Sequence, residues 1–470
     1  MFKAFTFALA LACAAPVFAQ DSDLARLREE MRELKRSHEE RMRALEQRLA
    51  EAEARAGKAE SSGAQAQKAA QPPAPLPSAR VTESTFNPAI SLILQGAYAR
   101  TSRDPDNFVI SGFVPSGGEV GPPKRSFGLG ESELVMSASI DPYFRGTAIV
   151  ALTPENEVEV EEAFVQTLAL PRGFTLKAGR FFSGIGYQNE IHRHAWDFQD
   201  APLPYKAFLG GRYRHDGVQL KWVAPTPFFL ALGGEIGSGE SFPGSDQNKN
   251  GAGGWALFGH VGGDIGASYA WRAGLSSLRA SARNRAYEDI DALGNAVTNV
   301  FNGTARAWVV DGVLKWAPHG NATRTNVKLQ AEYFRVKQDG TLTYSDTAQA
   351  APQFGVPFTD YFRAVQSGWY AQGVYQFMPR WRVGYRYDEL RYGTVNVGIV
   401  TNALGPTAAD FPTLARYQPT RNTAMLDFSP SEFSRFRLQF ATDRSRQGAT
   451  DNQVFLQYIH SLGAHGAHRF

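Results

Sequence analysis

Three stretches of the chain alternate strictly between apolar and polar residues. In residues 434–440 the even positions are Ser, Phe, Leu and Phe, and the odd positions are Arg, Arg and Gln. The same two-residue period recurs in residues 327–333 and 381–388. Because successive side chains of a β-strand point to opposite faces, each stretch is predicted to be a strand with one apolar and one charged face.

Alternation of this kind is compatible with two architectures. A soluble sandwich turns the apolar faces of its strands toward a core, whereas an outer-membrane barrel turns them toward lipid and lines its lumen with the polar faces. The lengths of the connections distinguish the two. Tight predicted turns alternate with connections that are mostly long, namely 100–128, 183–211, 281–304, 338–364 and 393–417.

Short turns on one side and long loops on the other are typical of bacterial outer-membrane barrels. Residues 86–470 are therefore predicted to form an all-β, transmembrane antiparallel β-barrel of about 16 strands, with 14 or 18 strands as alternatives. A barrel of that size is expected to leave an aqueous channel rather than a packed core. The chain has no run of about 18 apolar residues, so no membrane-spanning helix is predicted.

The first residues indicate export. Lys3, a short apolar run and the small residues before Gln20 predict a signal peptide over residues 1–19. Cys13 as a lipidation site is the alternative, although the residues before it fit that signal poorly. Because Cys13 is the only cysteine, the mature chain cannot form disulfides.

Residues 21–56 have a different period. Apolar residues recur at alternating spacings of three and four, with one stutter near His38, and charged residues lie between them. This pattern predicts a coiled coil in the periplasm, and a single solvated amphipathic helix is the alternative. Residues 57–85 are rich in Ala, Gln and Pro and are predicted to be a linker. The formal net charge of +3 argues against a nucleic-acid partner.

Residues 189–200 read NEIHRHAWDFQD and concentrate the chemistry of the chain. Imidazole and carboxylate groups bind zinc-like cations, so Glu190, His192, His194 and Asp197 are candidate metal ligands. The alternative is a polar, pore-lining loop without a bound metal. No G-x-S-x-G or comparable catalytic motif is present, so the chain is predicted not to be an enzyme and to need no cofactor beyond a transient zinc-like cation.

The alternation also predicts which charges line the lumen. An acidic wall partly facing a basic wall would create a transverse field that discriminates between solutes by charge. The alternative is that these side chains are merely solvated. The predicted pore-lining residues are Glu131, Glu133, Glu157, Glu159 and Glu161 on the acidic side, Lys328, Arg382, Arg386, Arg435 and Arg437 on the basic side, and Asp200 in the loop.

Several stretches resemble a known family. Residues 86–96, 130–134, 161–171, 176–190 and 200–210 are similar to outer-membrane proteins labelled zinc-regulated TonB-dependent outer membrane receptors and, more distantly, to phosphate-selective porins. The resemblance covers residues 86–470 and implies location in the bacterial outer membrane, with the N-terminal arm in the periplasm. In the resembled porins, which are trimers, the fifth connection folds into the pore, so residues 183–211 would narrow it.

The expected function is a porin-like channel for passive or substrate-selective diffusion of small solutes or ions, with a link to metal cations left open. Its expected partners are outer-membrane lipid and two further copies of the chain in a homotrimer. One alternative is a structural anchor whose coiled coil engages peptidoglycan. The other is a TonB-dependent receptor, which is disfavoured because such receptors have a separate plug domain and a roughly 22-stranded barrel.

Overall fold

The computed structural model describes residues 88–117, 120–246 and 248–463. The predicted signal peptide (1–19), coiled coil (21–56) and linker (57–85) lie outside the described residues. None of the helices in the described part of the chain has the length and apolar character needed to cross a membrane.

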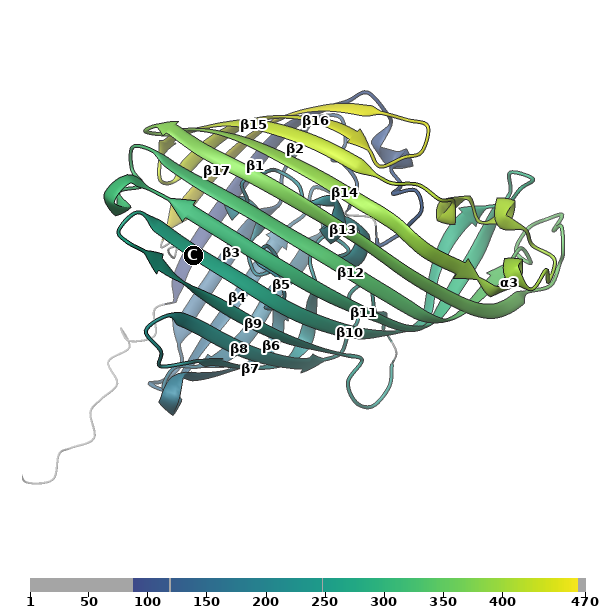
Figure 1. Ribbon diagram of the computed structural model, residues 1–470, viewed down its shortest axis with the longest axis horizontal. Coiled ribbons are helices and arrows are strands. Elements are labelled where there is room, and N and C mark those ends of the chain that lie inside the picture. The colour runs from purple at the N-terminus through teal and green to yellow at the C-terminus, as the bar shows by residue number, and fades with distance from the viewer. Residues whose placement is uncertain (1–87, 118–119, 247, 464–470) are drawn as a thin grey trace, which may run out of the picture. The chain divides into compact units, whose positions relative to one another are not determined.

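The described strands form one antiparallel sheet that closes on itself, because β1 pairs with both β17 and β3 (Figure 1). The short β2 continues the line of β3 along β1, so the two share one place in the ring. The ring therefore has sixteen places, as predicted, and the alternatives of 14 and 18 are wrong. Its first strands are β1 (Ala89–Thr101), β2 (Ser126–Leu129), β3 (Ser132–Ser139), β4 (Phe144–Leu152), β5 (Val158–Thr167), β6 (Phe174–Phe182), β7 (Arg214–Val223), β8 (Phe229–Gly237) and β9 (Gly254–Ile265).

The second half of the ring contains the longest strands. These are β10 (Tyr269–Ile290), β11 (Ala296–Trp316), β12 (Asn326–Ser345), β13 (Phe358–Met378) and β14 (Trp381–Val397), followed by β15 (Thr420–Ser431), β16 (Ser434–Arg444) and β17 (Asp451–Gly463). The helices within residues 88–463, as far as these are described, are short. They are α2 (Leu203–Leu209), α3 (Gly398–Thr401) and the 3-10 turns η2 (Pro105–Asn107), η4 (Pro171–Gly173), η5 (Arg193–Ala195), η6 (Pro318–Gly320), η7 (Ala408–Asp410) and η8 (Pro412–Leu414).

The outer surface of the ring is apolar and the inner surface is largely polar. Leu275, Trp308 and Val310 point outward and are each 51–53% exposed. Inward positions are occupied by groups such as Glu133 and Arg386, which are buried inside the ring. This arrangement is the inverse of a soluble sandwich and is typical of a barrel that lies in a lipid bilayer.

Strands β10–β14 rise well beyond the rest of the ring. They contain 17 to 22 residues, whereas β3–β9 contain 8 to 12. About 9 to 11 residues suffice for a tilted strand to cross a bilayer. The extra length projects at the end that carries α3 (Figure 1), which is also the end with the longer connections. We call this the loop end and the opposite one the turn end.

Two of the predicted long loops are therefore too long, and a third is shifted. Much of 281–304 belongs to β10 and β11, which are joined by residues 291–295, and β12 and β13 likewise shorten 338–364 to 346–357. The predicted loop 393–417 is shifted to 398–419. In β10 a bulge between Ala282 and Arg285 changes which positions face inward. The lipid-facing pattern of β10 ends before this bulge, because the outward positions after Leu275 are Ser277, Arg279 and Ser281, although the strand continues.

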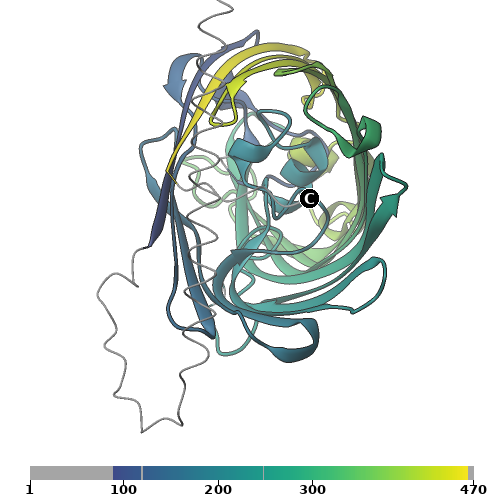
Figure 2. The ribbon, with the colours of Figure 1, turned by 90° about the vertical axis from the view of Figure 1, so that its left-hand side faces the viewer.

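The connection between β6 and β7, residues 183–213, enters the ring, where Figure 2 shows it with the short helix α2. All seven residues of α2 are buried. Phe208 and Tyr205 pack against Phe334 of β12, and Phe113 from the connection after β1 contacts Phe208. The expected open aqueous channel is therefore wrong for this part of the lumen, which contains a packed apolar cluster.

Candidate functional site

Glu332 of β12 fixes the start of the inserted segment, residues 183–213. Its Oε2 accepts hydrogen bonds from the Tyr187 amide (3.1 Å) and the Tyr205 hydroxyl (2.9 Å), and its Oε1 accepts from the Gln188 amide (3.0 Å). The Tyr370 hydroxyl of β13 also donates to Oε1. The carboxylate is almost fully buried, so these four donors replace its hydration.

Backbone conformation brings the segment close to Glu332. Gly186 has a φ of +66°, and a Cβ on it would lie 2.4 Å from Glu332 Oε2. Only glycine combines this left-handed conformation with so close an approach.

The two histidines of the segment reach the acidic side of the ring. His192 Nδ1 lies 3.3 Å from Glu133 Oε2 and 3.2 Å from Glu161 Oε2, and His192 Nε2 lies 3.0 Å from Glu162 Oε2. His194 Nδ1 lies 2.9 Å from Glu133 Oε1. We call Glu131, Glu133, Glu161 and Glu162 the glutamate wall.

A bulge in β5 places two consecutive glutamates on that wall. Ile149 of β4 pairs with Glu162 and the next residue, Val150, pairs with Val160, so Glu161 has no partner in the ladder. A bulge of this kind turns both residues to one face, and both are buried inside the ring.

Two arginines complete the contacts on this side. Arg193 Nη1 lies 2.9 Å from Glu131 Oε2, and Arg212 Nη2 contacts Glu161. Arg214 at the start of β7 pairs with Glu159. Glu157 is exposed in the connection between β4 and β5.

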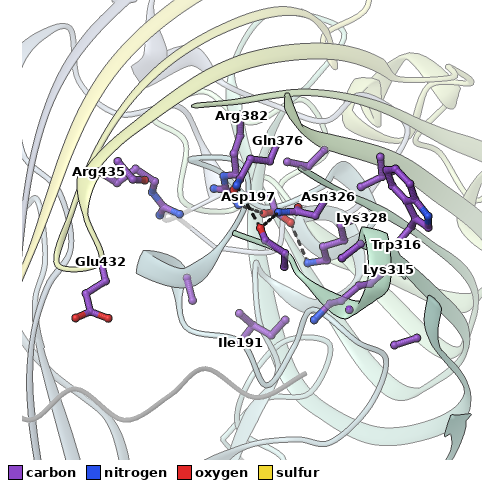
Figure 3. A pocket seen from close by; sticks show the side chains of 18 of the residues that line it. Ile191, Asp197, Lys315, Trp316, Asn326, Lys328, Gln376, Arg382, Glu432 and Arg435 are labelled. Atoms are coloured by element: carbon purple, nitrogen blue, oxygen red, sulfur yellow. Dashed lines mark hydrogen bonds and ion pairs between the residues drawn. The ribbon is translucent and has the colours of Figure 1, made fainter. Parts of the chain in front are cut away.

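The opposite side of the ring is basic and receives the aspartates of the segment. Lys328 Nζ lies 2.9 Å from Asp197 Oδ2, and Arg382 Nη1 lies 3.2 Å from Asp197 Oδ1 (Figure 3). We call this side the arginine wall. It consists of Lys328, Arg382, Arg386, Arg421, Arg435 and Arg437, contributed by β12 and β14–β16.

Asp200 has more cationic partners than Asp197. Its carboxylate lies 2.9 Å from Arg421 Nη2, 3.1 Å from Lys206 Nζ and 3.3 Å from Arg386 Nη2. Gln439 also donates a hydrogen bond to it. Both arginines and Lys206 are almost fully buried, so this carboxylate neutralises charges that have little access to water.

The backbone of the segment is held on the same side. Arg437 donates a hydrogen bond to the Trp196 carbonyl (3.0 Å) and pairs with Asp427 of β15. Arg435 donates to the His194 carbonyl. The segment is thus bound to both walls through side chains of opposite charge.

The electrostatics of the segment follow from these contacts. Burial alone would lower the pKa of His192, but the charge of Glu133 and the hydrogen bonds to the glutamate wall outweigh it and raise this pKa well above its ordinary value. Burial would raise the pKa of Asp200, but the charges of Arg421, Lys206 and Arg386 hold it below its ordinary range. Lys328 and Arg382 do the same for the pKa of Asp197.

The structure does not bring the four predicted metal ligands together. His192 and His194 lie at the glutamate wall, whereas Asp197 lies at the arginine wall. Glu190 is not among the contacts of either wall and lines, near Lys177 and Lys221, the turn-end cavity that His192 and His194 also line. The grouping of these four residues as one site is therefore wrong. Within the residues that the structure describes, Glu133, Glu161 and His192 are a group whose ligand atoms lie close enough together to hold an ion.

The predicted pore-lining residues occupy different positions. Glu131, Glu133 and Glu161 face the lumen, as do the basic residues predicted on the other side, so the two walls have opposite charge. Charged side chains of the segment pair with both walls, and the alternation along the strands did not predict this. Glu157 does not belong to the glutamate wall, because it lies before the start of β5.

Sequence reasoning missed five functional residues: Glu162, Arg193, Arg212, Glu332 and Arg421. The alternation of β15 could have identified Arg421, which shares the parity of inward-facing Thr423 and Asp427. Glu332 also follows the alternation of its strand. The bulge in β5 breaks the alternation at Glu162, so its inward direction could not be predicted. Arg193 and Arg212 lie in the inserted segment, which has no regular alternation.

Cavities lie on both sides of the segment. Two adjoining cavities of about 860 and 730 Å³ at the turn end share Tyr187, Ile191 and His194 as lining residues. A smaller cavity of about 140 Å³ is lined by Arg193, Asp200 and residues of the connections at the loop end. The small cavity shares no lining residue with the other two, so the segment separates them.

Comparison with known proteins identifies one curated relative. An uncharacterized protein of Aquifex aeolicus (strain VF5) is 30% identical over 419 residues, which cover 83% of this chain and 81% of the relative. No family model matches the chain. The expected resemblance to TonB-dependent receptors is not supported, because the ring has sixteen places rather than the roughly 22 strands of that class.

Solved structures with a similar fold are outer-membrane proteins. They include a loop L8 deletion mutant of OmpT from Vibrio cholerae (TM-score 0.49, 13% identity, 80% of this chain and 99% of that chain) and the outer membrane channel DcaP of Acinetobacter baumannii (0.46, 12%, 81% and 99%). An anion-selective porin from Comamonas acidovorans gives a TM-score of 0.43 with 10% identity, over 80% of this chain and 99% of that chain. Likeness at this level does not transfer a solute, a partner or an assembly to this chain.

Proposed function

We propose that this chain, which belongs to the same family as the uncharacterized protein of Aquifex aeolicus, is an outer-membrane channel for small hydrophilic solutes or ions. One observation carries the proposal: the apolar-coated ring has a charged interior that is crossed by a segment bound to both walls. A purely structural barrel would need no opposed charged walls and no cavities on either side of such a segment.

The membrane location rests on the outer surface of the ring. Large apolar side chains are exposed around it, which is stable in lipid and unfavourable in water. β1 begins and β17 ends at the turn end, where Ser91 pairs with Gly463. Turns of outer-membrane barrels face the periplasm, so the N-terminal arm would lie there.

The passage would conduct when the inserted segment leaves one wall. Its contacts with the walls are made mainly by side chains, and the ladder from β6 to β7 is complete without it, since Phe182 pairs directly with Arg214. The segment can therefore move without breaking the ring. Its release would expose the glutamate wall and the arginine wall to water, so passing solutes would experience a field across the lumen.

Single-channel recording in planar bilayers tests this function. The wild-type chain should show low conductance with rare openings. A variant in which residues 188–211 are replaced by a short Gly-Ser linker should show a larger and steady conductance, because β6 and β7 remain adjacent. A correctly folded linker variant that never conducts would contradict the channel and favour the structural anchor, whose test is co-sedimentation with peptidoglycan.

The proposal includes a homotrimer held in part by residues 21–56, because a narrow apolar seam needs partner helices. Deleting these residues should leave a folded barrel, since all ring pairing lies after residue 88. Chemical cross-linking should detect trimers in the wild type and fewer in the deletion variant. Loss of heat-modifiable migration on gels after the deletion would show that the barrel depends on the arm.

A further inference from the structure

Three ligand atoms at the glutamate wall surround a point that fits a metal ion. His192 Nδ1, a carboxylate oxygen of Glu133 and one of Glu161 all lie within 4.8 Å of one another. His192 Nδ1 is 3.3 Å from Glu133 Oε2 and 3.2 Å from Glu161 Oε2. In a tetrahedral zinc site with bonds of about 2.0–2.2 Å, neighbouring ligand atoms are roughly 3.3–3.6 Å apart.

The other ring nitrogen of His192 has the partner that a metal-bound histidine requires. His192 Nε2 lies 3.0 Å from Glu162 Oε2 and can donate its hydrogen to it. Histidine ligands usually donate the remaining N–H to a carboxylate, which fixes the ring orientation and directs the free nitrogen lone pair at the metal. A cation bound there takes the place of the Nδ1 proton, which is released to water, and the freed lone pair on Nδ1 points between Glu133 and Glu161.

Glu133 supplies an independent observation. Its side chain is completely inaccessible to solvent, and no group within the described residues donates a well-formed hydrogen bond to its Oε2. A buried acceptor without a hydrogen bond is costly. Its other oxygen, Oε1, is occupied by His194 Nδ1 at 2.9 Å, so Oε2 is the atom left for a cation.

The surrounding charge and access also suit a cation. The four carboxylates of the glutamate wall face two guanidinium groups, those of Arg193 and Arg212. Arg212 contacts Oε1 of Glu161 and leaves Oε2 for another partner. The turn-end cavity of about 730 Å³ is lined by Glu162, His192 and His194, so an ion could enter from that end.

From these contacts we propose a site for a divalent cation of zinc-like chemistry, with His192 Nδ1, Glu133 Oε2 and Glu161 Oε2 as ligands. Glu162 and His194 orient the ligands, and the fourth position is open to water. The bound ion joins β3 and β5 to the inserted segment and so holds the segment on the glutamate wall. This regulatory role rests on the proposed channel function, whereas the binding site itself does not.

Calorimetric titration of the folded, untagged full-length chain with zinc chloride tests the binding site. The wild type should bind one zinc ion that is absent from His192→Gln. Glu162→Gln, which removes only an orienting partner, should weaken binding by about 10- to 100-fold. His319→Asn is the matched control, because His319 is exposed in the turn between β11 and β12 and should leave this binding unchanged.

Cobalt substitution gives a second readout, since a tetrahedral cobalt site absorbs visible light much more strongly than an octahedral one. If His192→Gln does not fold, Glu133→Gln serves in its place because it preserves side-chain shape. Equal zinc binding in wild type, His192→Gln and Glu133→Gln would overturn the site, as would a wild type that binds no zinc stoichiometrically.

Conductance separates this site from the proposed function. Zinc should reduce the openings of the wild type and have no effect on the Gly-Ser linker variant, which lacks His192. Stoichiometric zinc binding together with a linker variant that never conducts would retain the site and reject the channel. Conductance without zinc binding would retain the channel and reject the site.

Discussion

Asp200 is the residue whose replacement should open the passage most directly. Its carboxylate pairs with Arg386, Arg421 and Lys206, all of which are almost fully buried. Arg386 also pairs with Asp388 and Arg421 with Asp443, so Lys206 depends most on Asp200. In Asp200→Asn the amide oxygen can still accept hydrogen bonds, but the three cations lose their shared countercharge. Removing one partner of a buried ion pair costs about 3–5 kcal/mol.

This free-energy cost destabilises the closed state, in which the segment is bound to both walls. The open state avoids the cost, because water can solvate the same cations once the segment has moved away. A free-energy change of about 3–5 kcal/mol corresponds to a shift of roughly two to three and a half powers of ten in the ratio of open to closed states. Openings that are rare in the wild type should therefore dominate in Asp200→Asn.

The assay is the fraction of time that single channels conduct in planar bilayers. Asp339→Asn is the matched control, since Asp339 pairs with Lys337 and Arg363 on an exposed surface. Exposed pairs contribute about 0–1 kcal/mol, which corresponds to a change of about fivefold or less. An Asp200→Asn barrel that folds normally and opens no more often than Asp339→Asn would refute the reasoning.

Three further predictions concern other parts of the passage. Glu332→Gln replaces one of the two acceptor oxygens by an NH₂ group, which would face two hydrogen-bond donors. The inserted segment should therefore loosen, and buried Trp196 should become more accessible to acrylamide quenching. Unchanged quenching would contradict the role of Glu332 as an anchor of the segment. Buried Asp200 has its pKa lowered by Arg421, Lys206 and Arg386, so its stabilisation of closure is complete above the ordinary value of 3.8 and is lost only as pH falls through the lowered pKa. The conductance difference between wild type and Asp200→Asn should therefore stay constant from pH 7 to pH 5, and a decline within that range would refute the assignment. In the variant with the Gly-Ser linker, replacing Glu157 and Glu159 by Gln should lower the cation-to-anion permeability ratio. The effect should be larger at low salt, where the Debye length is about 30 Å, than at 1 M, where it is about 3 Å. An unchanged reversal potential would show that these two carboxylates do not act on ions at the loop-end opening.

The ring could be predicted because its strands follow one simple rule. In the membrane-facing part, outward positions are apolar and inward positions polar, and this period identified β12, β14 and β16 directly. The rule does not hold in the loop-end parts of β11 and β12. There apolar Val297, Phe301, Leu342 and Tyr344 face inward, and polar Thr298 and Thr343 face outward. Strand ends predicted from the lipid-facing alternation therefore fell short of the actual strand ends on the loop side of the barrel.

The site was only partly predictable, because an inserted segment has no period. The sequence identified His192, His194, Asp197 and Asp200 as chemically important, but their closeness along the chain suggested one shared site. The chain turns at η5, which contains His194, so the histidines reach β3 and β5 and the aspartates that follow reach β12, β14 and β15. The course of the segment through the lumen depends on its hydrogen bonds to Glu332. These bonds join residues that are far apart in the sequence, so no local pattern predicts them.

The attachment of the segment to opposite walls also has a mechanical consequence. A ring of hydrogen-bonded strands resists stretching along its circumference, but the same circumference can enclose a round or a flattened opening. The segment acts as a cross-brace between the glutamate wall and the arginine wall, and it fixes the distance between β3 and β5 on one side and β12 and β14–β16 on the other. The width of the opening therefore depends on the length of one loop as well as on the number of strands.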